Sequence, residues 1–356
     1  MTDIRPFRGL RYDPKRVELS TVIVPPYDVI SDAQRGAYYD RDPHHAIRFA
    51  LTRDPRDQAT TDYREIREQL DAWQASGVLV RDAAPALYVM KQSFAQHGRR
   101  YERTGFFAEL VLADYAEGVV LRHERTLDKP IADRLRLLRA ARANLSSAFL
   151  LYRDEQSALD GVLAEALATA PLGRAVDDVG VEYEVGALRG EDAARACAFL
   201  ADRSVVIADG HHRYQTALRY RDEQRAAGAG PDAPSEATLA FFANADAEGS
   251  LLLPIHRAVV DVAAPSAADW CERLPDWQCR EVRIGAGRDI DDVLAAELAP
   301  HAGHPAFAAD DGSGTLRVFS QARALGEDLV VDVLEREVLR AVFGLGEAEK
   351  IGRAHV

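Results

Sequence analysis

The chain has 356 residues, of which 47% are hydrophobic and 28% charged, enough apolar material for one large core or two smaller ones. The net charge is −13, and no basic stripe is present. Nucleic acid and anionic membrane surfaces both attract clustered Lys and Arg, so we expect neither as a partner. The sequence shows no signal peptide and no apolar run of the roughly 20 residues that a membrane helix needs. Its three cysteines form no CxxC pair, which indicates a reducing, cytoplasmic location.

The N-terminal region begins with a strand-like run followed by an amphipathic pattern. Residues 21–24 (TVIV) predict a short strand that ends at Pro25 and Pro26. Apolar residues then recur every three or four positions from Tyr63 to Trp73, which predicts a helix that Gly77 ends.

Three further strands and a second helix are predicted next. The runs 86–94 and 99–112 flank the short segment AQHG, the pattern of a β-hairpin. The run 118–127 predicts a third strand, and we expect all three to share an antiparallel sheet. The pattern over 128–144 predicts a helix with Pro130 in its first turn.

Within that helix, neighbouring residues i and i+1 do not face each other. We therefore expect Asp133 and Arg134 to have separate partners, as solvated charges on the helix surface; the alternative is that Arg134 or Arg142 reaches an anion.

The rest of the chain continues to mix strands and helices. The predicted elements are a strand over 147–152, helices over 162–170 and 191–203, paired strands over 238–246 and 250–260, and a helix over 329–344. Frequent hairpins among helices favour an α+β fold with mixed, mostly antiparallel sheets and packed helices.

The chain divides by pattern into residues 1–155, residues 156–350 and a short end. The last six residues, IGRAHV (351–356), match one translated frame of a common sequencing adapter. We expect them to be a library scar that ends a truncated chain, and they are left out of the fold prediction.

The most informative stretch is SVVIADGHHRYQTALRYRDEQ (204–224), where a β-branched run meets a helical pattern with arginines and aspartates on its outer face. The strand-to-helix turn carries Gly210, His211, His212 and Arg213. A helix start presents unpaired N–H groups and the positive end of the helix dipole, which together attract anions. Histidines and a guanidinium add donors suited to phosphate, so we predict a phosphate site here.

Asp209, directly before this turn, has several possible roles. It can cap the helix, orient a histidine, or hold Mg²⁺. The simpler alternative is that Asp209 only caps the helix while the histidines are exposed. Zinc binding is less favoured, because no HExxH spacing accompanies the adjacent histidines.

The motif ADGHHRYQTAL resembles the signature of the ParB/sulfiredoxin superfamily, in which a turn before a helix holds nucleotide phosphates. It is also similar to the Asp-Gly-His-His-Arg turn of free-serine kinases. Sulfiredoxins have a cysteine where His211 stands, so this resemblance does not extend to sulfinic-acid repair. It implies a ParB/sulfiredoxin-like core around the turn.

A narrower resemblance covers residues 4–350. It is carried by the motifs IRPFRGLRYDP, VPPYDVIS, HERTL, DRLRLLRAARANLS, VVIADGHHRYQTAL and PIHR, which resemble the domain-of-unknown-function 1015 family. Members of that family continue with a segment rich in Pro, Lys, Ser and Thr, which this chain lacks.

Three other places carry candidate residues. Asp28 follows a rigid Pro pair and either lies in a simple turn or faces the site, where it would help Asp209 hold Mg²⁺. His123 and Glu124 lie at a strand end, where either can act as a general base or belong to a surface charge cluster. His256 and Arg257 interrupt an apolar strand and need polar partners, for which a bound anion is one candidate.

Together these features predict a nucleotide-dependent phosphotransferase, a small-molecule kinase that uses ATP or ADP with Mg²⁺ and a small hydroxylated acceptor. One alternative is a nucleotide-binding switch, or slow NTPase, that acts through a protein partner. A second alternative is a metal-dependent hydrolase that uses the histidine pair.

Overall fold

A computed structural model describes residues 1–53, 63–96, 98–123, 128–251, 256–259, 262–285, 287–326, 328–345 and 352–354. The chain forms two compact units, Met1–Leu252 and Leu253–Val356. The boundary predicted at residue 155 does not coincide with this division, because strands after that position complete the sheet that earlier strands begin. Among the described residues, no helix combines the length and apolar composition of a membrane span.

The first unit is built on a nine-stranded mixed sheet, which confirms the predicted α+β class. Its strands, in spatial order, are β6 (Val120–Leu121), β10 (Val205–Asp209), β7 (Ala148–Tyr152), β11 (Ala237–Asn244), β5 (Arg99–Val111), β4 (Leu87–Gln96), β9 (Glu182–Leu188) and β8 (Pro171–Val176), with β1 (Ile4–Arg5) paired to β5. Most neighbours are antiparallel, whereas β6 with β10 and β7 with β11 run parallel. A separate pair joins β2 (Leu10–Tyr12) to β3 (Leu79–Arg81).

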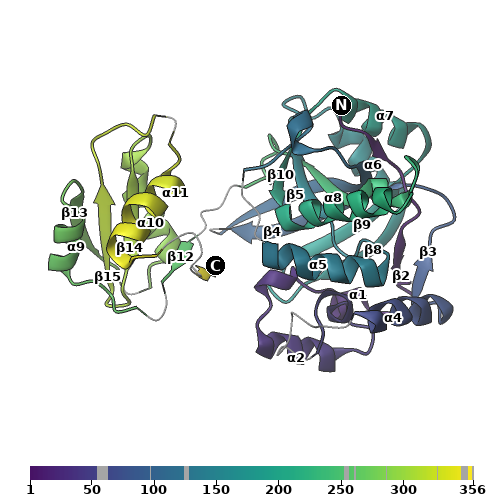
Figure 1. The fold of residues 1–356 in the computed structure, drawn as a ribbon, viewed down its shortest axis with the longest axis horizontal. Helices are drawn as coiled ribbons and strands as arrows, with labels where there is room; N and C mark the ends of the chain where they lie inside the picture. The colour runs from purple at the N-terminus through teal and green to yellow at the C-terminus, as the bar shows by residue number, and fades with distance from the viewer. Residues whose placement is uncertain are drawn as a thin grey trace. The chain divides into compact units, whose positions relative to one another are not determined.

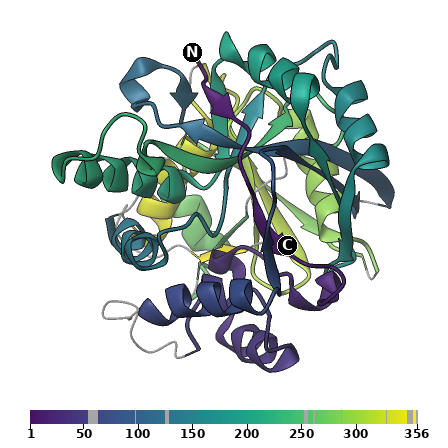
Figure 2. The ribbon, with the colours of Figure 1, turned by 90° about the vertical axis from the view of Figure 1, so that its right-hand side faces the viewer.

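Helices surround these strands, as Figure 2 shows. They are α1 (Leu19–Val22), α2 (Asp32–Arg41), α3 (Ile47–Ala50), α4 (Arg64–Ala75), α5 (Asp128–Ala141), α6 (Asp160–Thr169), α7 (Gly190–Ala201) and α8 (His211–Ala226). Short 3₁₀ turns are η1 (Tyr27–Val29), η2 (Tyr115–Glu117) and η3 (Pro234–Glu236). The predicted strand over 21–24 is wrong, because Thr21 and Val22 are the last residues of helix α1, which packs against β8 (Figure 1).

Alternation along the strands builds the main core. Phe106 and Phe242 are fully buried and stack with ring centroids 5.6 Å apart, and Leu150 and Ile207 lie opposite each other in the register of β7 and β10. Buried residues of α6, α7 and α8 complete this cluster. Burying a side chain of this size contributes about 1.5–3 kcal/mol, so the strand pattern that predicted the sheet also supplies its stability.

The second unit contains a three-stranded antiparallel sheet of β13 (Gln278–Arg283), β15 (Thr315–Ser320) and β14 (Ala306–Asp310). Its helices are α9 (Ala267–Arg273), α10 (Ile290–Leu298) with the 3₁₀ turn η4 (Ala299–His301), and a continuous helical run of α11 (Val330–Val333), the π-turn η5 (Leu334–Leu339) and α12 (Arg340–Phe343).

The strand predicted over 250–260 is only partly within the described residues. There it contributes β12 (His256–Ala258), which pairs with β16 (Gly352–Ala354) and not with β11; β16 lies within the suspected adapter segment.

Candidate functional site

The candidate site lies where two parallel strands end. β6 and β10 are neighbours, with Val205 opposite Val120 and Val206 opposite Leu121. Parallel neighbours finish at the same edge of a sheet. The segment that follows β6 and the turn that follows β10 therefore reach the same edge, although they are more than 80 residues apart in the sequence.

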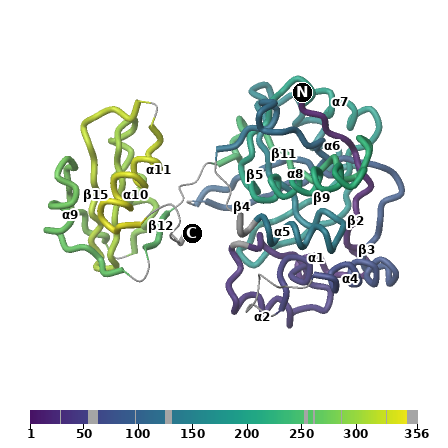
Figure 3. The backbone as a smooth tube through the Cα atoms, viewed as in Figure 1, coloured from purple at the N-terminus to yellow at the C-terminus, as the bar shows by residue number. Residues whose placement is uncertain are grey.

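The two helices that follow these strands, α5 and α8, pack along each other (Figure 3). Arg139 lies near the C-terminal end of α5, and Glu223 lies near the C-terminal end of α8. Nε of Arg139 donates to Oε2 of Glu223 at 3.0 Å. Because the C-terminal ends of the two helices meet, the helices run in the same direction and start at the same edge. Their positive dipole ends therefore lie on the same side of the unit, which favours a negative charge there.

The turn before α8 depends on Gly210. This residue has φ 89° and ψ 30°, in the left-handed region that side chains disfavour. A Cβ here would lie 3.1 Å from Cζ of Arg213 and 3.2 Å from Cα of Ala148. The sequence therefore needs glycine at this position for both conformation and space.

The start of α8 has the features of an anion site. The first intrahelical bond runs from the N–H of Tyr214 to the carbonyl of Gly210, at 3.0 Å. The N–H groups of residues 211–213 precede it and have no intrahelical acceptor. No side chain caps the helix from Gly210, and no acidic residue lies in the first turn to offset the dipole.

Two histidines from different segments meet at this edge, one after β6 and one at the first position of α8. The rings of His123 and His211 lie with centroids 4.6 Å apart, at an interplanar angle of 89°. His211 is buried, whereas His123 is exposed. His212, next along the helix, is half-buried, and its carbonyl accepts a bond from Oγ1 of Thr216 at 2.7 Å. The pairing of His123 with His211 brings together two motifs that are distant in the sequence.

Arg213 is engaged within the chain at both ends of its guanidinium. Nη1 donates to the carbonyl of Ser147, and Nη2 pairs with the carboxylate of Asp209 one helical turn earlier. The Arg213 side chain is 16% exposed. In this arrangement Arg213 braces the turn against the start of β7, and it would have to leave Asp209 to reach a phosphate.

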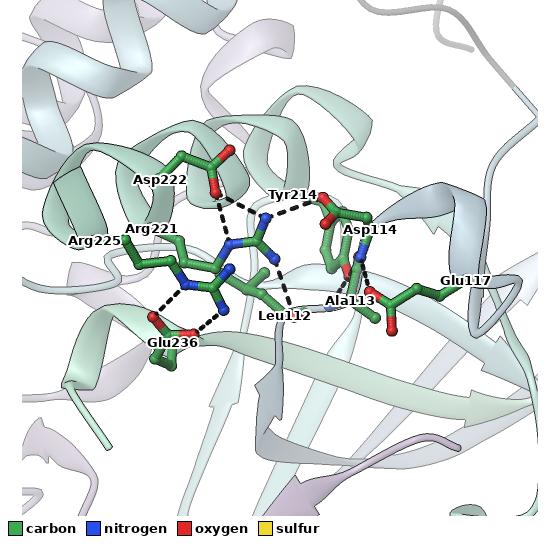
Figure 4. Close-up of polar contacts among 9 residues, drawn as sticks. All are labelled: Leu112, Ala113, Asp114, Glu117, Tyr214, Arg221, Asp222, Arg225 and Glu236. Carbon is green, nitrogen blue, oxygen red and sulfur yellow. Dashed lines mark hydrogen bonds and ion pairs between the residues drawn. The ribbon is translucent and has the colours of Figure 1, made fainter. Parts of the chain in front are cut away.

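The first turn of α8 is anchored by Tyr214. Its hydroxyl donates to the carbonyl of Ala113 at 2.8 Å and accepts from the N–H of the same residue at 3.2 Å (Figure 4). Tyr214 is fully buried, and this burial raises the pKa of its phenol well above the usual value. The sequence could not indicate this contact, because its two residues are 101 positions apart.

Farther along α8, the expected outer face is partly wrong. Arg221 is buried, not solvated, and donates to the carbonyl of Leu112 at 3.2 Å and to carboxylates of Asp114 and Asp222 at 3.0 and 2.8 Å (Figure 4). These contacts fix α8 to the chain after β5, so the turn is held on a rigid element.

Comparison with known protein families matches residues 4–322 to the family described as "Protein of unknown function (DUF1015)". The chain belongs to this family. The turn, the histidine pair and the anchor of α8 all lie within the matched residues. Two further comparisons, with curated proteins and with solved structures, found no match.

In this DUF1015 protein the Pro25-Pro26 loop packs against α5. Its 3₁₀ turn η1 begins at Tyr27, and the guanidinium of Arg134 lies 4.3 Å from the centre of the Tyr27 ring. This distance is typical of a cation–π contact. The loop is therefore tied to α5, the helix that packs along α8.

Arg134 also corrects the prediction made for the surface of α5. It is buried and donates from Nε to the neighbouring Asp133 at 3.0 Å, while the hydroxyl of Tyr63 donates to the same carboxylate at 2.9 Å. The two residues share partners, because a long guanidinium can fold back onto an adjacent carboxylate when neighbouring helices exclude water.

Several predicted site residues cannot be placed with the turn. Glu124 and the side chain of Asp28 lie outside the described residues. His256 and Arg257 belong to the second unit, where Nε2 of His256 is 3.5 Å from Oδ1 of Asp291. The structure thus brings together His123 and the Asp209–Arg213 turn.

Within the described part of the DUF1015 chain, no group of three or more His, Cys, Asp or Glu residues is placed to hold a metal ion. Mg²⁺ bound together with phosphates often uses only one or two carboxylates, and the Asp209 carboxylate, which is 55% exposed, is of that chemical type.

Proposed function

We propose that this DUF1015 protein binds the phosphates of a nucleotide at the β10–α8 turn and transfers a phosphoryl group to a small hydroxylated acceptor. The observation that carries the proposal is the convergence of two helix starts and the His123–His211 pair at one sheet edge. Support also comes from the resemblance of the turn to the phosphate-binding turns of ParB/sulfiredoxin-like proteins and free-serine kinases.

In this proposal the phosphates contact the backbone N–H groups of residues 211–213, and the imidazoles of His123 and His212 donate to their oxygens. Asp209 would help hold the Mg²⁺ that neutralises phosphate charge, and Asp28 is the second carboxylate expected there. Arg213 keeps the turn in shape and gains a direct phosphate contact if Asp209 turns to the metal. His256 and Arg257, for which the sequence suggested a bound anion, belong to the second unit, and the site proposed here is built without them.

Glu124, the residue after His123 in the chain, is the general base expected from the sequence. It would accept the proton of the acceptor hydroxyl, or His123 would do so. Phosphoryl transfer needs no covalent protein nucleophile, because positioning and charge neutralisation provide most of the rate.

The first experiment measures binding of ADP and ATP with Mg²⁺ by calorimetry. We expect His123→Ala to weaken binding, since this exposed side chain can be removed without loss of the fold. The matched control is His304→Ala, which removes an imidazole from the second unit and should leave affinity unchanged. Arg213→Ala should weaken binding by about 1–3 kcal/mol, the value of a charged hydrogen bond. Equal affinities in folded wild type and both site variants would contradict the proposed site.

The second experiment separates the possible activities. Incubation with ATP or ADP and a panel of small alcohols yields a phosphorylated acceptor if the protein is a phosphotransferase. Hydrolysis or binding without phosphorylated acceptor would instead identify a nucleotide-binding switch, and stoichiometric zinc in the purified protein would favour a hydrolase. Glu124→Gln should retain binding and lose turnover; if it loses neither, Glu124 is not the base.

A further inference from the structure

A pocket of about 800 Å³ lies within the first unit, and its lining residues all fall between Arg11 and Val185, away from the β10–α8 turn. One side of it is formed by strands β4, β8 and β9. The other side is formed by α1, the Pro25-Pro26 loop and α2. This volume is within the range of roughly 300–1,000 Å³ that is typical of small-molecule sites.

The strand side of the pocket follows from alternation. Met90 of β4 lies opposite Val185 of β9, and both line the pocket together with Tyr183, two residues along β9. Val89, the neighbour of Met90, points instead into the main core. The pocket therefore uses the sheet face opposite to that core.

The helical side of the pocket is fastened to the sheet. Oγ of Ser20 accepts from the N–H of Val176 at 3.0 Å. Arg41 of α2 donates two bonds to Asp178, each of 2.9 Å. Leu19 lies against Gly173 of β8. These contacts hold both walls, so the pocket exists before any ligand arrives.

Most of the lining is apolar, its three arginines are ion-paired within the chain, and the Asp177 carboxylate accepts hydrogen bonds within the chain. The apolar residues at the loop side include Ile23, Pro25, Pro26 and Val29. The charged lining residues each have a partner: Arg11 with Asp82 at 2.9 Å, Arg41 with Asp178, Arg174 with Glu184 at 3.0 Å, and Asp177 with the hydroxyl of Tyr183 at 2.8 Å. An anionic ligand would have to displace the carboxylate partner of one of these arginines, whereas an uncharged ligand would not.

We propose that this pocket binds an uncharged, predominantly apolar small molecule that carries at least one ring. Apolar walls favour burial of such a molecule by the hydrophobic effect, and the tyrosine rings of the lining provide surfaces for ring contact. The pocket is a second binding site, and it stands or falls independently of nucleotide binding at the turn.

The test uses two fluorescent probes that share one ring system. N-phenyl-1-naphthylamine is uncharged, and its 8-sulfonate derivative is an anion. We expect the full-length protein to bind the uncharged probe saturably and to bind the sulfonate more weakly by about tenfold or more. No saturable binding of the uncharged probe, or tighter binding of the sulfonate, would overturn the proposal.

A matched pair of variants tests whether the uncharged probe binds in this pocket. Ala37 and Ala33 are both exposed on α2, but Ala37 lines the pocket and Ala33 does not. Ala37→Trp should weaken binding of the uncharged probe by about tenfold or more, whereas Ala33→Trp should leave it unchanged. Val29→Trp fills the pocket from the loop and should act like Ala37→Trp.

Two results with these variants would refute the site. Equal affinity in both alanine variants would show that the probe binds elsewhere. A change of oligomeric state in Ala37→Trp, measured by light scattering, without a change in probe affinity would show that the pocket is an interface between copies of the chain.

Discussion

Replacing Gly210 by alanine tests whether the turn before α8 is built as the structure describes. Gly210 has φ 89°, and an alanine there pays the cost of the left-handed region, about 1–2 kcal/mol. Its Cβ would also lie 3.2 Å from the backbone of Ala148, which is tighter than ordinary van der Waals contact. Overpacking of this kind costs about 1–3 kcal/mol, so Gly210→Ala should lower the free energy of unfolding by about 2–5 kcal/mol.

The control lies at the other end of the same helix. Gly228 follows α8 with φ 95°, and a Cβ there would meet no atom within 4 Å. Gly228→Ala therefore carries the conformational cost alone, about 1–2 kcal/mol. The difference between the two variants isolates the contact with Ala148 and Arg213, because both changes replace glycine by alanine at nearly the same positive φ.

Urea unfolding followed by far-ultraviolet circular dichroism measures both variants. The difference of about 1–3 kcal/mol, divided by a slope of roughly 1–3 kcal/mol per molar urea, places the midpoint of Gly210→Ala lower than that of Gly228→Ala by about 1 M at the centre of both ranges. Both glycines belong to the first unit, so the same transition reports both. Identical midpoints for the two variants would refute the tight packing of the turn, and with it the placement of Arg213 and Ser147 around it.

Two further predictions concern buried polar side chains. Tyr214→Phe leaves the N–H and the carbonyl of Ala113 without the tyrosine hydroxyl, so the free energy of unfolding, measured by chemical denaturation, should fall by about 1–3 kcal/mol. Tyr220→Phe is the control and should change it little. Equal effects of the two variants would show that the hydroxyl contact is not made. Burial lowers the pKa of His45 to about 4, while Nδ1 accepts from the N–H of Ile47 at 3.1 Å. The unfolded chain then binds more protons between the unfolded pKa, near 6.5, and pH 4, so this histidine makes stability fall as pH falls, by at most about 1.4 kcal/mol per unit. His45→Asn keeps an acceptor and removes the titration, so its stability should depend less on pH over this range; an unchanged slope would show that His45 is not the titrating group.

Much of the fold is readable from local patterns. Alternation identified the β4–β5 hairpin, and apolar spacing from Tyr63 to Trp73 identified α4, because a half-buried strand or helix imposes its own period on the sequence. The run 21–24 predicts a strand, yet its first two residues, Thr21 and Val22, end helix α1. A short apolar run does not distinguish strand from helix, and packing against β8 decides between them.

The candidate site divides in the same way. The strand, the Gly210 turn and the helix after it follow from neighbouring residues and were predicted correctly. The meeting of His123 with His211 required the parallel pairing of β6 with β10, which no local period encodes. The pairing of Arg213 with Asp209 and Ser147 was not predicted, since the sequence shows which groups can bond but not which partner reaches them first.

The sequence by itself determined where the β4–β5 hairpin, α4, β10 and α8 form, and that a glycine-dependent turn with two imidazoles opens α8. Side-chain size, branching and conformational preference act over a few residues, so they are legible in the chain. Only the tertiary structure decided that two helix starts share one sheet edge, that Tyr214 and Arg221 anchor α8, and that a pocket lies behind the Pro25-Pro26 loop. Those features depend on contacts between segments far apart in sequence. Which of these contacts form depends on the free energies of many competing arrangements of the whole chain.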